Sequence, residues 1–114
     1  YVLRPDLYED LYKYSPTFAL LMAPFDYLPH GLGVVGWNLL NTAVLLAGVW
    51  HYVADTPNPD QTRRTVLLIV FAEALITAQN LQSNNLIVGA TLLGLTALRS
   101  ERPGRAAFWF TLCA

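Results

Sequence analysis

The fold of this chain is decided by residues 31–54, which read GLGVVGWNLLNTAVLLAGVWHYVA. The run contains no Asp, Glu, Lys or Arg. It exceeds the roughly 20 apolar residues that an α-helix needs to cross a bilayer core of ~30 Å. We therefore expect a transmembrane helix here. The alternative is the central helix of a soluble helical bundle, which would need protein around it on all sides.

The composition of the whole chain favours a membrane protein. Of its 114 residues, 54% are hydrophobic and 13% are charged, whereas soluble domains carry about 25% charged residues. A formal net charge of −1 without a basic patch argues against a nucleic-acid partner. The single cysteine, Cys113, excludes an internal disulfide, and His30 and His51 do not have the spacing of a helical zinc motif. We therefore expect no metal site.

Prolines, glycines and polar turns divide the rest of the chain into further helices. We expect an outer-face segment over residues 1–15, a re-entrant or interfacial helix over 16–28, transmembrane helices over 31–54, 64–79 and 83–98, and the start of a further helix over 106–114. The first of these helices is too short to span a bilayer. The predicted fold is all-α: a polytopic transmembrane helix bundle with a short re-entrant or interfacial helix and about four transmembrane helices, the last truncated. Because the chain starts without Met and stops inside an apolar run, we expect a single internal fragment of a multi-spanning membrane domain.

The basic residues predict the orientation of these helices. Arg63 and Arg64 follow the loop that begins at Asp55, and residues 99–105 hold three more arginines. The turns at 28–31 and 80–85 hold none. Since positively charged loops stay in the cytoplasm, these two turns should lie on the extracytoplasmic side. Residues 1–15 should lie on the same side as these turns, unless segment 16–28 crosses the membrane.

The turn over residues 79–85, QNLQSNN, concentrates carboxamides on that outer side. Carboxamides both donate and accept hydrogen bonds, which suits sugar hydroxyls or phosphate oxygens at a membrane surface. Gln79, Asn80 and Asn84 are the candidate substrate-binding residues. The alternative is structural, since Asn and Ser are also favoured in turns and at helix N-termini.

A second candidate group precedes the first helix. Lys13 can hold a lipid phosphate, Tyr14 can stack on a sugar ring, and Ser15 adjoins them. The alternative is an interfacial anchor, because Tyr and Lys are common at membrane surfaces.

Glu73 is a carboxylate in an otherwise apolar predicted span. Such groups are costly in a membrane and usually functional or paired. It shares a helix face with Thr77 and Asn80. The alternative is a structural hydrogen bond to Asn38 or Asn41 on the neighbouring helix.

The polar residues inside 31–54 have structural explanations. Asn38, Asn41 and Thr42 share a helix face, and buried amides hold transmembrane helices together. His51 lies between Trp50 and Tyr52, where we expect an interfacial aromatic belt rather than a ligand site.

Several short motifs follow one another along the chain. They are YKYSPTFA at 12–19, APF at 23–25, LP at 28–29, WNLLN at 37–41, QN at 79–80 and QSN at 82–84. In this order they resemble glycosyltransferase family 87, the polyprenyl-phosphate-dependent membrane transferases of GT-C type that include α-mannosyltransferases. The resemblance covers nearly the whole chain.

The resemblance implies an enzyme of the bacterial inner membrane. It would transfer a mannose-like hexose from a polyprenyl-phosphate sugar to a glycan or glycolipid acceptor on the extracytoplasmic side, with the lipid-linked sugar as substrate and no cofactor. The alternative is a non-enzymatic polytopic protein, such as a transporter or lipid-binding subunit, with Glu73 in a permeation path.

The resemblance also implies roles for residues. Those expected to line the lipid-phosphate or sugar side are Lys13, Tyr14 and Ser15, and those expected to line a polar cavity are Gln79, Asn80 and Asn84. The general base of such enzymes is a carboxylate in an early outer loop. That loop would precede Tyr1, so we assign no catalytic residue.

Overall fold

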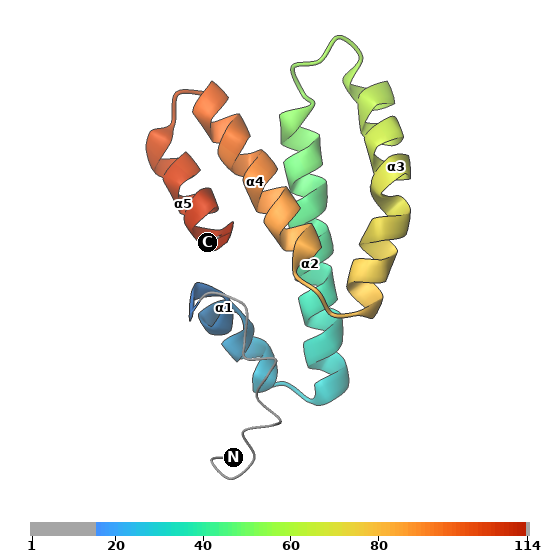
Figure 1. Cartoon of the computed structure of the whole chain (residues 1–114), viewed down its shortest axis with the longest axis vertical. Helices are drawn as coiled ribbons and strands as arrows, with labels where there is room; N and C mark the ends of the chain where they lie inside the picture. Colours follow the sequence, from blue (N-terminus) through green and yellow to red (C-terminus); the bar gives the residue numbers. More distant parts are fainter. Residues whose placement is uncertain (1–15, 114) are drawn as a thin grey trace, which may run out of the picture.

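The computed structural model describes residues 16–113, with side chains from Leu20 onward. Over this range it contains five helices and no strand (Figure 1). The helices are α1 (Pro16–Asp26), α2 (His30–Tyr52), α3 (Pro59–Gln79), α4 (Asn84–Arg99) and α5 (Pro103–Cys113). The predicted all-α class is confirmed. The predicted outer-face segment, 1–15, lies outside the described residues.

Three of the five helices begin at a proline, and this explains where they start. Pro16, Pro59 and Pro103 are the first residues of α1, α3 and α5. Proline suits this position because its φ is already helical and its missing N–H would have no partner inside the helix. As a result α3 begins ahead of the expected residue 64, and α5 ahead of 106.

The helices run up and down, so that the connections gather toward two ends of the chain (Figure 1). The loop 53–58 and the turn 100–102 lie at one end (Figure 1). Five arginines lie in the turn 100–102 or in the helix turns next to these connections: Arg63, Arg64, Arg99, Arg102 and Arg105. We call this the basic end. The turn 27–29 and the loop 80–83 lie toward the opposite end, which we call the carboxamide end.

Helices α2 and α4 form the centre of the structure and touch through their backbones. A Cβ atom added to Gly48 would lie 2.5 Å from the carbonyl oxygen of Gly89. A Cβ atom on Gly89 would in turn strike the carbonyl oxygen of Val44. Small residues at such crossings let helices pack closely, as is common in membranes. The surrounding buried side chains include Leu45 and Ala90.

Helix α2 is the one helix of the described part that is long and apolar enough to cross a membrane. It has 23 residues and a mean hydropathy of 1.6, which corresponds to about 35 Å of helix. Only 33% of its most apolar stretch is buried, so the described residues do not surround it as the soluble-bundle alternative requires. Helix α3 carries Arg63, Arg64 and Glu73 along its 21 residues, and α4 has only 16 residues. The further membrane crossings therefore stay predictions.

At the basic end, two arginines hold the last turn of α2. Arg63 donates a hydrogen bond to the carbonyl oxygen of Trp50 at 3.2 Å and lies over the indole, 3.8 Å from its centre. Arg99 donates to the carbonyl oxygen of Tyr52 at 3.3 Å and lies 4.2 Å from the centre of its ring. Cations stabilise a helix C-terminus because they bond its free carbonyls and oppose its dipole. Both guanidinium groups therefore stabilise the C-terminal end of α2.

Candidate functional site

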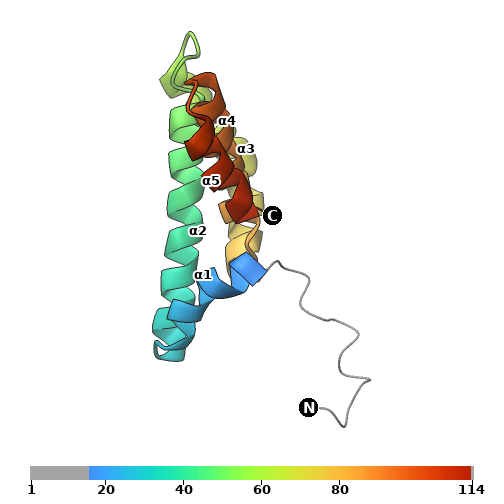
Figure 2. The same ribbon diagram turned by 90° about the vertical axis from the view of Figure 1, so that its left-hand side faces the viewer.

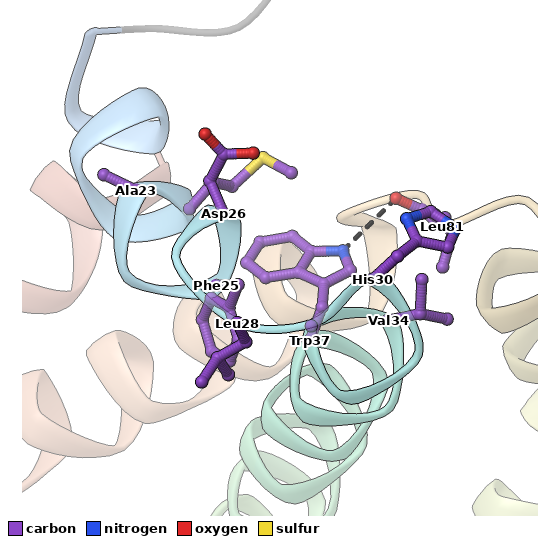
Figure 3. Close-up of a pocket in the computed structure, with 10 residues that line it drawn as sticks. Ala23, Phe25, Asp26, Leu28, His30, Val34, Trp37 and Leu81 are labelled. Atoms are coloured by element: carbon purple, nitrogen blue, oxygen red, sulfur yellow. Dashed lines mark hydrogen bonds between the residues drawn. The ribbon is translucent and has the colours of Figure 1, made fainter.

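A pocket of about 620 Å³ opens at the carboxamide end, between α1, the first turns of α2 and the loop 80–83 (Figure 3). Its walls are mainly apolar and aromatic. The lining residues are Met22, Ala23, Phe25, Asp26, Leu28, His30, Gly33, Val34, Trp37 and Leu81. A few polar groups in an apolar pocket are typical of binding sites for small molecules.

Glycines on α2 allow α1 to approach and form one wall of this pocket. A Cβ atom on Gly33 would lie 2.6 Å from the carbonyl oxygen of Phe25, and one on Gly36 would lie 2.9 Å from its ring. The ring of Phe25 meets Trp37 edge to face, with centres 5.8 Å apart, a favourable arrangement for aromatic pairs. Helix α1 therefore lies obliquely across the first turns of α2 (Figure 2).

Trp37 joins the two sides of the pocket. Its side chain is 3% exposed, and its Nε1 donates a hydrogen bond to the carbonyl oxygen of Leu81 at 3.2 Å (Figure 3). Leu81 is in the left-handed region, with φ 53°. The N–H groups of Leu81 and Gln82 bond the carbonyls of Ala78 and Thr77, which is the Schellman pattern that ends a helix. The turn that ends α3 thus fixes the position of the Leu81 carbonyl to which Trp37 donates.

Asn41 fixes the start of α4 against α2. Its Nδ2 donates to the carbonyl oxygen of Trp37 at 2.9 Å, and its Oδ1 accepts from the backbone N–H of Leu86 at 3.2 Å. The first N–H groups of a helix have no partner within the helix, and Ser83, the residue before α4, makes no capping bond with its side chain. The prediction that Asn41 packs α2 against a neighbouring helix is therefore confirmed, and its partner is α4.

Asp26 and His30 supply the ionisable groups of the pocket, and both side chains are exposed. In Figure 3 they lie on opposite sides of the Trp37 indole. A carboxylate accepts hydrogen bonds, and a neutral imidazole both donates and accepts them, so a hydroxylated ring could bind between the two groups. We missed Asp26 in the sequence, although it is the one charged residue of the segment 16–28.

The carboxamides predicted to bind substrate lie beside this pocket but do not line it. Gln79, Asn80 and Asn84 are exposed at the carboxamide end, and Nδ2 of Asn84 donates to Oε1 of Gln82 at 3.2 Å. Of the turn 79–85, only Leu81 is part of the pocket wall. Their role in substrate binding stays a prediction. Lys13, Tyr14 and Ser15 lie outside the described residues, so their roles stay predictions as well.

Two other polar residues of this turn are buried. Asn85 is buried, and its Nδ2 donates to the carbonyl oxygen of Ala74 at 3.2 Å, which ties α4 to α3. Ser83 is also buried and immediately precedes α4. For Asn85 the structural alternative is correct, whereas the hydroxyl of Ser83 makes no capping bond, so its structural role stays a prediction.

The structure separates Glu73 from the polar residues with which we grouped it, while its place inside a membrane stays a prediction. Its side chain is exposed on α3, whereas Thr77 is fully buried, so the two do not line one polar surface. Within residues 16–113 Glu73 makes no hydrogen bond or ion pair, so the alternative of a structural hydrogen bond to Asn38 or Asn41 is wrong. The physical reason is that Nδ2 of Asn41, the group that could donate to a carboxylate, donates to the carbonyl oxygen of Trp37 instead.

A comparison with protein-family models matches glycosyltransferase family 87 over residues 12–114. Comparisons with curated proteins and with solved structures gave no match. Among the described residues, no group of three or more His, Cys, Asp or Glu side chains gathers as a metal site would require. Because the family match covers nearly all of the sequence, the chain belongs to glycosyltransferase family 87, and membership implies a membrane-associated enzyme that transfers a sugar.

Proposed function

We propose that the chain is part of a polytopic membrane enzyme of GT-C type. The enzyme transfers a mannose-like hexose from a polyprenyl-phosphate sugar to a glycan or glycolipid acceptor at the extracytoplasmic face of the bacterial inner membrane. The observation that carries the proposal is the family match over residues 12–114. The lipid-linked sugar is a substrate, and the proposal needs no cofactor.

The exposed apolar surface of α3 supports the proposal that the bundle lies in a membrane. This helix buries only Thr77 against the rest of the described chain. Its exposed large side chains are Leu68, Ile69, Phe71, Leu75 and Ile76. Contiguous apolar surface of this kind on a soluble protein would mark an interaction site or an aggregation risk. Lipid, or other helices of a membrane domain, would cover it.

The segregation of charge supports the proposed orientation. All five arginines between residues 63 and 105 lie at the basic end. The positive-inside rule then directs the carboxamide end, with its pocket, away from the cytoplasm. That end also carries Gln79, Asn80 and Asn84. Lys13, Tyr14 and Ser15 directly precede α1, which forms one wall of the pocket.

The pocket at the carboxamide end suits a ligand with a sugar and an apolar tail. Phe25, Leu28 and Val34 supply apolar walls, while Asp26 and His30 can bond sugar hydroxyls. We propose that these two residues orient the sugar. The general base belongs to an outer loop that precedes Tyr1.

The proposal can be tested with membranes that contain the intact protein and labelled polyprenyl-phosphate mannose. We expect transfer to a glycan or glycolipid acceptor, and we expect Asp26→Asn to lower it about tenfold, as the loss of one charge-assisted hydrogen bond would. The matched control is Glu101→Gln, which removes an exposed acid at the basic end and should transfer at the parent rate. Absence of transfer from every polyprenyl-phosphate sugar tried would contradict the proposal. Parent-like activity of Asp26→Asn, Lys13→Ala and Asn80→Ala together would remove the proposed binding site.

A further inference from the structure

A second pocket, of about 500 Å³, lies between α2, α4 and α5 and extends to the basic end. It is separate from the pocket at the carboxamide end, and no lining residue is shared. Its lining residues are Ala43, Val44, Ala47, His51, Leu93, Thr96, Ala97, Ser100, Arg102, Arg105 and Trp109.

The chemistry of this second pocket changes along its length. On α2 the lining begins with Ala43 and Val44 and ends with His51. On α4 it begins with Leu93 and continues to Ala97, and Ser100 follows in the turn after the helix. The eight steps from residue 43 to residue 51 correspond to about 12 Å of helix. The pocket is therefore apolar at the depth of the helix centres and polar at the basic end.

The positive charge at the polar end of this pocket is not used by the fold. Arg63 and Arg99 hold the last turn of α2, and Arg63 also pairs with Asp60 at 2.8 Å. By contrast, the guanidinium groups of Arg102 and Arg105 make no hydrogen bond or ion pair to any residue between 16 and 113. They remain available to a ligand, together with the imidazole of His51 and the hydroxyl of Ser100.

We propose that this pocket binds an anionic membrane lipid. Arg102 and Arg105 hold its phosphate, and an acyl or prenyl chain lies against Ala43, Ala47 and Leu93. Guanidinium groups bond phosphate oxygens in pairs, and basic pockets between transmembrane helices are known to hold anionic headgroups. An ordinary soluble phosphate compound would leave the apolar part of the pocket unfilled. The inference rests on the proposed membrane location and is independent of sugar transfer.

The test measures lipid binding rather than transfer, so its failure is distinct from a failure of the proposed enzyme activity. The intact protein is purified in micelles and titrated with phosphatidylglycerol, with phosphatidylcholine and with inorganic phosphate. Native mass spectrometry then counts the bound molecules. We expect phosphatidylglycerol to bind more tightly than the other two. Equally tight binding of inorganic phosphate would show an anion site without a lipid and would overturn the proposal.

Substitutions in the pocket test whether the lipid binds there. We expect Arg102→Gln and Arg105→Gln each to weaken phosphatidylglycerol binding about tenfold, as the loss of a charge-assisted hydrogen bond would. The matched control is Arg64→Gln, which removes an exposed arginine from the same end but outside this pocket. It should bind like the parent. Equal losses in all three variants would indicate general charge attraction, and no loss in the first two would also overturn the proposal.

One further variant tests the apolar part of the pocket without changing charge. Ala43 is exposed, so Ala43→Phe can fill the pocket without disturbing the core. We expect it to weaken phosphatidylglycerol binding and to leave the thermal midpoint unchanged. Parent-like lipid binding in Ala43→Phe would show that no chain occupies this part of the pocket, and the lipid proposal would fail.

Discussion

The indole of Trp37 on α2 donates a hydrogen bond to the backbone carbonyl of Leu81, 44 residues later in the chain. This bond joins the wall formed by α1 and α2 to the end of α3. It depends on the left-handed backbone of Leu81, with φ 53°. The shape of the pocket at the carboxamide end thus depends on one side chain and one strained turn.

The first prediction concerns this bond. Trp37→Phe keeps an aromatic ring beside Phe25 but removes the donor to Leu81. We expect the free energy of unfolding to fall by at least about 1 kcal/mol, the usual net value of one hydrogen bond. Chemical denaturation of the intact protein in micelles measures it. The control Trp50→Phe changes an exposed indole and keeps an aromatic ring under Arg63, so an equal loss there would contradict this explanation.

The second prediction concerns Asn41, which holds the start of α4. Asn41→Leu keeps the volume but leaves the N–H of Leu86 buried without its acceptor. An unsatisfied buried donor costs about 1–3 kcal/mol, so the unfolding midpoint should fall accordingly. The neighbouring Thr42 is exposed, and Thr42→Val should leave the midpoint nearly unchanged. If Asn41→Leu proved neutral, the bond to Leu86 would not stabilise the fold.

These contacts show how far the sequence could predict the structure. The apolar run 31–54 and the prolines were enough to predict an all-α chain with a long α2, and the arginine loops were correctly grouped at one end. A buried amide on a helix face was enough to predict the packing role of Asn41. All of these features are local patterns of charge, hydropathy or turn residues.

The pocket could not be predicted in the same way. It exists because Gly33 lets the backbone of Phe25 approach α2 and because Leu81 adopts a left-handed conformation that is unusual outside glycine. Neither relation has a periodic signal in the sequence. The exposure of Glu73 within the described residues could not be predicted for a similar reason, since it depends on how much of α3 packs against α2 and α4.

The third prediction tests the close contact between α2 and α4. A methyl group on Gly48 would lie 2.5 Å from the carbonyl oxygen of Gly89, so Gly48→Ala must push the helices apart. We expect a loss of about 1–3 kcal/mol, as for other overpacked sites. The control is Gly31→Ala in the same helix, where nothing lies within 4 Å of the added atom. Because alanine favours helix formation, that variant should be neutral or stabilising by up to about 1 kcal/mol. An equal loss of stability in both variants would contradict the explanation.

The fourth prediction concerns the end of α4, which repeats the turn found at the end of α3. Glu101 has φ 53°, and the N–H groups of Glu101 and Arg102 bond the carbonyls of Leu98 and Ala97. A left-handed conformation costs a residue with a Cβ atom roughly 1–2 kcal/mol, and glycine avoids this cost. Glu101→Gly should therefore raise the free energy of unfolding by about 1 kcal/mol, after allowance for the greater freedom of glycine in the unfolded chain.

Glu101→Ala separates the backbone effect from the charge. It removes the same carboxylate but keeps the Cβ atom, so the strain of the left-handed turn remains. We expect its stability to match that of the parent in the same denaturation experiment. If alanine stabilised the protein as much as glycine, the gain would come from removing an acid beside the C-terminus of α4, where a negative charge opposes the helix dipole, and the backbone explanation would be wrong.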